Sequence, residues 1–475
     1  MSGLKSAWLN WSKTPPAART LIVLAFIAAP ALGVLAMTMG LLSQSKPAFI
    51  AILPTILLLG FSLILERRGL LLFLLIVRGG LDPFLEATRV PLGSASMGLG
   101  GVLNGLLIVL AIIEARRQNN DDLPRMLKKG VPLALVLLFA LMRSPAPAEA
   151  TKLLLNIVTY ACMFSLGVVL AREKGLDYVL KVVLYASIPA ISLSLVMYVT
   201  GWQVGAGAAN LGEWIESRGR FQGSFAHPNI MAFFLTNTVI VCLYLFPKIE
   251  SKAQRLGIYI TLALALTLII LTKTRAAWIA LAMIFALYGV LFNRKLLAPM
   301  IILGAITSLI PEVQERLLSL KDDRPYLIYS TLNSYAWRKA IWADALAYMN
   351  ASTWLIGAGL QGFFVDSVKF FHLSGGNPFG AHNVYVQLLY DTGIFGLTLW
   401  VALLLSLIIP ILKAWNKDRA TAFAGLCFWV VYVTVGYSDN ILGYLVYNIY
   451  FWIAIGAITH DVMNAPPKRN RDTNL

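Results

Sequence analysis

The chain has 475 residues, of which 58% are hydrophobic and only 13% are charged, and its formal net charge is +16. Soluble domains carry about 25% charged residues, so the composition excludes a soluble protein and indicates one embedded in a membrane. The positive charge does not indicate nucleic-acid binding, because the basic residues lie in short loops between apolar runs, as membrane topology requires.

Apolar runs long enough to cross a bilayer recur along the whole sequence. The first, at 21–43, is too long for the core of a cleavable signal peptide, and we expect it to be retained as a helix. In chain order the sequence predicts fourteen spanning segments: 21–43, 47–65, 69–77, 95–114, 131–143, 153–171, 178–200, 229–246, 257–271, 276–292, 296–310, 383–411, 420–436 and 440–459. The third and fifth are short and are either re-entrant or extended into their loops. The expected fold is therefore all-α and polytopic, with about 12–14 transmembrane helices.

Charges in the loops predict the orientation of the chain. With the N-terminus placed in the cytoplasm, the cytoplasmic pieces hold 24 basic residues and the short loops on the other side hold nine. Six further basic residues lie in one long outer loop, 311–382, to which the positive-inside rule does not apply. This division predicts that both termini are cytoplasmic and that loops 201–228 and 311–382 lie outside.

The predicted segments divide the chain into four regions. Residues 1–200 form N-terminal transmembrane helices, 201–310 form transmembrane helices with arginine motifs on the outer side, 311–382 form the large outer loop, and 383–475 form C-terminal transmembrane helices and a basic cytoplasmic tail. Because long loops usually carry function, the outer side is where we expect the site.

Two stretches of the long loop have recognisable patterns. "NSYAWRKAIWADALAYM" (333–349) predicts an amphipathic helix that lies at the membrane interface with Trp337 and Trp342. "GAGLQG" (357–362) matches G-x-G-x-x-G, but it has no βαβ setting, so we do not expect a dinucleotide site. A glycine-rich bend that brings the backbone close to the site is the better interpretation.

Three arginines on the outer side are candidates for binding a diphosphate. Arg220 lies beside a glycine-rich bend in "RGRFQGSFAHPN", Arg275 lies in the very short loop "TKTRAAW", and Arg338 lies four residues before Trp342 in "NSYAWRKAIW". Guanidinium groups bind phosphate oxygens bidentately. The alternative is that these side chains anchor helices at the membrane boundary, which is the role we expect for Arg218.

Two histidines precede apolar segments on the outer side. His382, in "GAHNVYVQ", stands at a helix start, where the helix dipole favours the neutral imidazole that can accept a proton. The alternative is that His382 only caps or packs against the helix. His227, in "HPN", is interpreted as mainly structural, with Pro228 and Asn229 shaping the entry to the helix.

These motifs, taken together, resemble the O-antigen ligase and polymerase superfamily. "RFQGSFAHPNIMAFF", "TKTRAAWIALA", "AWRKAIW", "GAGLQGFF" and "HNVYVQLLYDTGIFG" follow one another over residues 210–400 in the order and spacing of that family. The resemblance implies a bacterial inner-membrane glycosyltransferase that transfers a glycan from undecaprenyl diphosphate at the periplasmic face, without a metal or other cofactor. It also implies that Arg275 and Arg338 bind the diphosphate and that His382 is the essential histidine, while Arg220 matches a less uniform position.

Several alternatives stay open at this point. The sequence favours a polymerase of an O-antigen or exopolysaccharide, and the alternative is an O-antigen ligase that transfers the glycan to lipid A-core. The competing class is a transporter of lipid-linked glycans, although its polar site would be expected at mid-membrane. A further reading is a non-catalytic assembly protein, which would not require the arginines and the histidine. Trp337, Trp342, Tyr385, His227 and Asn229 are expected to contact sugar or loop, the aromatic rings by stacking on sugar faces. A chain-length regulator or a flippase is the expected protein partner.

Overall fold

The computed structural model describes residues 67–82, 85, 90–92, 95–117, 127–201, 220–292, 294–308, 314 and 334–464. Their helices are α4 (Arg67–Arg78), α6 (Leu99–Arg117), α8 (Val131–Met142), α9 (Pro147–Lys174), α10 (Leu176–Thr200), α12 (Pro228–Leu245), α13 (Lys252–Leu271), α14 (Arg275–Leu291), α15 (Leu297–Ser308), α17 (Ser334–Tyr348), α18 (Ala351–Ile356), α19 (Gly362–Phe370), α20 (Val384–Lys413), α21 (Arg419–Ser438) and α22 (Leu445–Asn464). A two-stranded antiparallel hairpin, β1 (Val90–Leu92) and β2 (Ala95–Met97), precedes α6.

The helices confirm the predicted all-α membrane fold. Segments 21–43 and 47–65 lie outside the described residues, and each of the other twelve predicted segments coincides with a helix. Among the described residues, eight helices are long and apolar enough to cross a membrane, and α8 and α14 are shorter apolar helices. The chain is therefore a multi-pass membrane protein.

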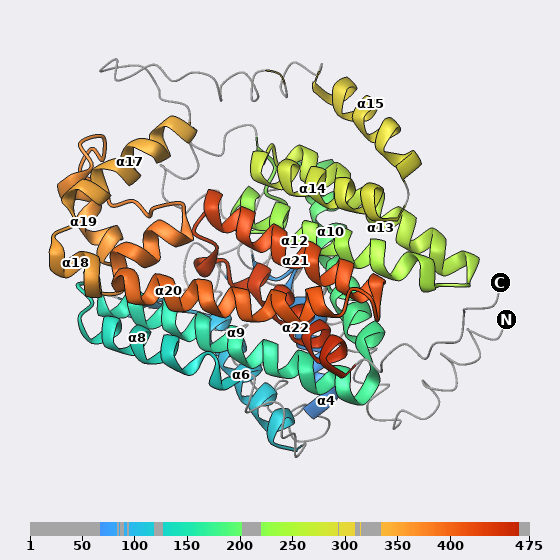
Figure 1. The fold of residues 1–475 in the computed structure, drawn as a ribbon, viewed down its shortest axis with the longest axis horizontal. Coiled ribbons are helices and arrows are strands. Elements are labelled where there is room, and N and C mark those ends of the chain that lie inside the picture. The colour runs from blue at the N-terminus through green and yellow to red at the C-terminus, as the bar shows by residue number, and fades with distance from the viewer. Residues whose placement is uncertain are drawn as a thin grey trace, which may run out of the picture.

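Helices α12 and α22 are the most buried of the described spanning helices, and α9 packs along α22 (Figure 1). Glycines let α9 and α22 approach closely. A Cβ atom on Gly167 of α9 would lie 2.1 Å from the carbonyl oxygen of Ile453, and one on Gly456 of α22 would lie 2.3 Å from that of Phe164. Small residues at such crossings increase backbone contact where no hydrophobic effect drives helices together in lipid. This packing fixes α22, whose first residues border the site.

Helices α17, α18 and α19 form a helical lobe at one end of the bundle (Figure 1). The predicted helix at 333–349 is present as α17. Its Trp337 packs against Phe371 and Phe379, and Trp342 packs against Tyr437 at the end of α21. Both indole rings thus contact other parts of the protein. The sequence analysis expected these rings at the membrane interface.

The glycine-rich bend 357–362 joins the helical lobe to α20. Ala358 N–H donates to the Tyr390 carbonyl at 2.8 Å and Gly359 N–H donates to the Asp391 carbonyl at 3.0 Å. A Cβ atom on Gly357 would lie 2.3 Å from the Asp391 oxygen, so only glycine allows this approach. Gly393, with φ +68°, interrupts α20 at the same contact. The bend therefore fixes the lobe against the helix that follows His382.

Candidate active site

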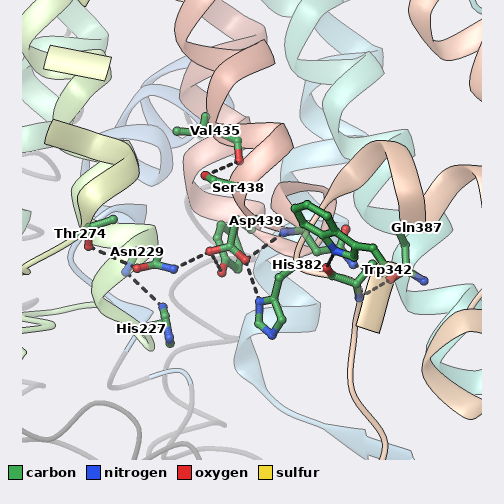
Figure 2. A network of polar contacts seen from close by, with 12 residues as sticks. His227, Asn229, Thr274, Trp342, His382, Gln387, Val435, Ser438 and Asp439 are labelled. Atoms are coloured by element: carbon green, nitrogen blue, oxygen red, sulfur yellow. Dashed lines mark hydrogen bonds and ion pairs between the residues drawn. The ribbon is translucent and has the colours of Figure 1, made fainter. Parts of the chain in front are cut away.

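A buried carboxylate, Asp439, is the centre of a polar network at the end of the bundle that carries the helical lobe (Figure 2). It directly follows α21 and is 1% exposed. Its two oxygens accept four hydrogen bonds: from His382 Nδ1 at 3.2 Å and Asn440 N at 2.9 Å on Oδ1, and from Asn229 Nδ2 at 2.5 Å and Tyr444 Oη at 2.7 Å on Oδ2. The sequence analysis did not select this residue.

The charge of Asp439 is stabilised by its neighbours. Burial raises the pKa of its carboxyl, but the hydrogen bond from His382 and the positive charge of Arg338 outweigh that effect and hold the pKa well below its usual range. Asp439 is therefore ionised at neutral pH. An ionised carboxylate only accepts hydrogen bonds, so all four partners must act as donors.

His382 faces Asp439 from the turn before α20. Because a carboxylate cannot donate, Nδ1 of the ring carries the proton, and Nε2 is the acceptor of the neutral ring. The side chain is 35% exposed, and its ring makes an edge contact with Trp337 at 5.8 Å between centroids. This is the arrangement that orients an imidazole for proton transfer at Nε2.

The capping role considered for His382 belongs to the next residue. Asn383 is the N-cap of α20, and its side chain accepts hydrogen bonds from the backbone N–H groups of Tyr385 at 2.9 Å and Val386 at 3.2 Å. His382 itself lies one residue earlier, in a left-handed backbone conformation with φ +47°. Its ring is thus directed to Asp439 and makes none of the contacts that cap the helix.

His227 is the N-cap of α12. Its Nδ1 accepts a hydrogen bond from the backbone N–H of Asn229 at 3.1 Å. Burial, against an opposing effect of Asp439 and with a smaller contribution from Arg220, lowers the pKa of His227 to about 4. The ring is neutral at neutral pH, as a hydrogen-bond acceptor must be.

Asn229 links Asp439 to the turn between α13 and α14. Its amide nitrogen donates to Asp439, while its Oδ1 accepts from Arg220 Nη2 at 2.5 Å and from Thr274 Oγ1 at 3.2 Å. Arg220 also donates from Nε to the Thr272 carbonyl at 3.0 Å and from Nη2 to Thr274 Oγ1 at 3.0 Å. Two nitrogens of the Arg220 guanidinium therefore hold this turn.

The other two candidate arginines come from neighbouring elements. Arg275 follows Thr274 directly and is the first residue of α14, where it is half-buried. Arg338 is half-buried on α17, and its positive charge lowers the pKa of both Asp439 and His227. The fold thus brings segments far apart in sequence to one end of the bundle. Arg218 lies outside the described residues.

Two of the candidate aromatic residues bind protein groups. Trp342 donates from its indole nitrogen to the Ala381 carbonyl at 2.6 Å. Tyr385 donates its hydroxyl to the Val433 carbonyl in α21 at 3.1 Å. Trp337 is the aromatic side chain that contacts the His382 ring. Within the described part of the chain, no group of three or more His, Cys, Asp or Glu side chains is arranged to hold a metal ion.

Residues 260–401 match the family model of the O-antigen ligases. The match confirms the resemblance to the O-antigen ligase and polymerase superfamily that the sequence motifs indicate. The matched segment contains Arg275, Arg338 and His382, whereas Asn229 and Asp439 lie outside it. No curated protein is similar enough to the chain to be matched. The match of this segment supports a glycosyltransferase role, of the ligase or polymerase type, for this membrane protein.

The sequence contained a signal for Asp439, the residue that the sequence analysis did not select. Asp439 is an acidic residue in the short polar stretch "YSDN" (437–440), between two apolar segments that are otherwise free of charge on that side. An ionisable residue at the boundary of two spanning helices is a candidate for function by default. What the sequence did not indicate is its partner, because His382 stands 57 residues away, in the turn before another helix.

Proposed function

We propose that this protein is a glycosyltransferase that transfers a glycan from undecaprenyl diphosphate to a sugar hydroxyl of an acceptor. The observation that carries the proposal is the hydrogen bond between His382 and the buried, ionised Asp439, next to arginines in a segment of the O-antigen ligase family. An oriented histidine supplies a base, and arginines supply charge for a departing diphosphate.

The reaction assigns each group one role. His382 Nε2 takes the proton of the acceptor hydroxyl as that oxygen attacks the anomeric carbon of the donor glycan. A new C–O bond forms, and the bond between the anomeric carbon and the diphosphate oxygen breaks. Undecaprenyl diphosphate leaves with the bonding electron pair, while Arg275 and Arg338 neutralise its charge.

Asp439 acts on His382 and not on the substrate. It fixes the ring with Nδ1 protonated, so that Nε2 faces outward as the acceptor, and it stabilises the imidazolium that forms on proton transfer. Arg220 completes the arrangement by holding Asn229 and the turn that precedes Arg275. This part of the proposal changes the expected role of Arg220 from a diphosphate ligand to a residue that positions the turn.

The site lies on the periplasmic side in this proposal. The 24-to-9 division of basic residues supports an N-terminus in the cytoplasm and a helical lobe outside. There the lipid-linked donor arrives with its diphosphate bond already activated, so transfer needs no nucleotide. The acceptor distinguishes two forms of the activity: a second lipid-linked glycan makes a polymerase, the form the sequence favours, and lipid A-core makes a ligase, the form the matched family is named for.

One experiment tests the proposal and separates these forms. Purified protein in lipid nanodiscs is incubated with undecaprenyl-diphosphate-linked glycan, with and without lipid A-core, and products are resolved by mass. We expect His382→Asn to lower transfer by about 10²–10⁴-fold, the usual loss on removing a general base, while the donor stays bound. Asparagine suits the test because it tolerates the left-handed backbone at position 382.

The outcomes exclude different parts of the proposal. Longer glycans without lipid A-core identify a polymerase, and a lipid A-core conjugate identifies a ligase. Transfer at a near wild-type rate by His382→Asn would show that His382 is not the base. Movement of the donor across a bilayer by the wild-type protein, with no transfer in either reaction, would show a transporter.

A further inference from the structure

The backbone of His382 has an unfavourable conformation that its surroundings must maintain. Its φ of +47° lies in the left-handed region, which non-glycine residues adopt only rarely. Such a conformation persists where neighbouring contacts over-determine it, and it is found mainly at functional sites. The contacts on either side of His382 therefore decide where its ring points.

Two side chains, Trp342 and Gln387 (Figure 2), hold both backbone polar groups of the residue that precedes His382. The Ala381 carbonyl accepts a hydrogen bond from the indole nitrogen of Trp342 at 2.6 Å. The Ala381 N–H donates to Oε1 of Gln387 at 3.1 Å. Ala381 is completely buried, so water cannot replace either partner. On the other side of His382, Asn383 is fixed as the N-cap of α20.

The same two side chains also contact the turn that carries Asp439. Gln387 is 3% exposed, and its Oε1 accepts a second hydrogen bond from Asn440 Nδ2 at 3.2 Å. Asn440 in turn donates its backbone N–H to Asp439. The ring of Trp342 makes an edge contact with Tyr437, two residues before Asp439, at 5.5 Å between centroids.

Gln387 is itself held in one orientation. Its amide nitrogen donates to Asp391 Oδ2 at 2.9 Å. Asp391 also accepts hydrogen bonds from the backbone N–H groups of Gln361 at 3.0 Å and Phe363 at 2.8 Å, at the start of α19. With its nitrogen occupied in this way, Gln387 must present its oxygen to Ala381 and Asn440.

We propose that Trp342 and Gln387 are positioning residues that hold the His382 turn against the Asp439 turn. Each bridges the two turns, and neither needs to touch the substrate. Trp342 lies one helical turn after Arg338 on α17. One face of this helix therefore carries both an arginine of the site and the tryptophan that holds the His382 turn. This inference rests on the proposed function and replaces the expected stacking of Trp342 on a sugar.

Trp342→Phe tests the inference, because phenylalanine keeps an aromatic ring beside Tyr437 but lacks the indole N–H. Transfer kinetics are measured for each substrate, with Trp342→Phe in the otherwise wild-type protein and in the His382→Asn background. Folding is checked by size exclusion and thermal melting. We expect kcat to fall about 10- to 100-fold, the cost of a displacement of about 1 Å at a reacting group, with KM unchanged. In the His382→Asn background the same change should have no further effect, since positioning residues act through the base.

Trp354→Phe is the matched control, because this exposed tryptophan lies on α18 of the same helical lobe, and we expect it to retain wild-type kinetics. Gln387→Met is a second variant, which removes the hydrogen bonds of Gln387 to Ala381 and Asn440. We expect it to lower kcat with KM unchanged, as Trp342→Phe does. A rise in KM with unchanged kcat for Trp342→Phe would mean that the ring binds sugar and would overturn the inference. So would unchanged kinetics, or an equal fold-loss in both backgrounds. Loss of activity in His382→Asn together with unchanged Trp342→Phe would overturn this inference and leave the proposed function standing.

Discussion

Replacement of Asp439 by asparagine is the sharpest test of the proposed mechanism. The carboxylate accepts four hydrogen bonds, two on each oxygen. Asparagine is nearly isosteric but offers one oxygen and one NH2 group, so in either orientation two donors face a donor. Asn229 cannot easily turn to compensate, because its own oxygen is held by Arg220 and Thr274.

The expected loss of kcat depends on which of the two Asp439 oxygen positions the new NH2 group occupies. If it faces Asn229 and Tyr444, His382 keeps its hydrogen bond and loses the charge beside it. A hydrogen bond to a charged group contributes about 1.5–3 kcal/mol and one to a neutral group about 0.5–1.5, so the lost charge costs about 1–1.5 kcal/mol. At about 1.4 kcal/mol per tenfold change, this corresponds to a rate loss of roughly 5- to 12-fold.

If the NH2 group faces His382, the loss is larger. Nδ1 must then become the acceptor, and the proton moves to Nε2, so the neutral ring no longer presents a base to the substrate. The loss should then approach the 10²–10⁴-fold, roughly, that follows removal of a general base. In both cases we expect at least about a fivefold fall in kcat.

The assay is glycan transfer from undecaprenyl diphosphate by purified protein at saturating substrates. Asp344→Asn is the matched control, because Asp344 also pairs with a histidine, His372, at 3.0 Å. This pair lies on the surface of the helical lobe, away from the network of Asp439. That exposed pair should be removable without loss of rate. If Asp439→Asn folds normally and transfers glycan as fast as Asp344→Asn does, Asp439 does not orient the base and the mechanism is wrong.

Three further predictions address the arginines, the topology and the stability of the site. Arg275→Lys and Arg338→Lys keep the charge but lose the bidentate fork, and each should lower kcat/KM by roughly 10- to 150-fold, whereas unchanged values would place the diphosphate elsewhere. A cysteine introduced for the exposed Asn377 should react with an impermeant thiol reagent in intact spheroplasts, and one introduced for Lys252 only after lysis; the reverse order would invert the topology. The folded-state pKa of His227, about 4, is below its usual 6.5, so its contribution to stability is complete above pH 6.5 and is lost as the pH falls toward 4. His227→Asn, which retains a capping side chain, should therefore lose less thermal stability than the wild type between pH 6.5 and 4, and identical pH profiles would contradict the assignment.

Sequence alone determined which segments enter the membrane. Transfer of a helix into hydrocarbon depends on the apolar length of that segment, about 20 residues, and hardly on its neighbours. The short predicted segments at 69–77 and 131–143 also coincide with helices, α4 and α8, although both are shorter than the eight helices long enough to span a membrane. The motifs of the outer loops likewise indicated the family without any structure.

Tertiary structure decided which side chains meet. Asn229 and Asp439 are 210 residues apart, and they touch because the start of α12 and the end of α21 lie at the same place in the packed bundle. The sequence also allowed His382 to cap α20, whereas in the structure Asn383 caps the helix and the His382 ring contacts Asp439. Hydrophobic partition acts on each segment separately, whereas a hydrogen bond requires two groups within about 3 Å, and only the packing of helices brings them that close.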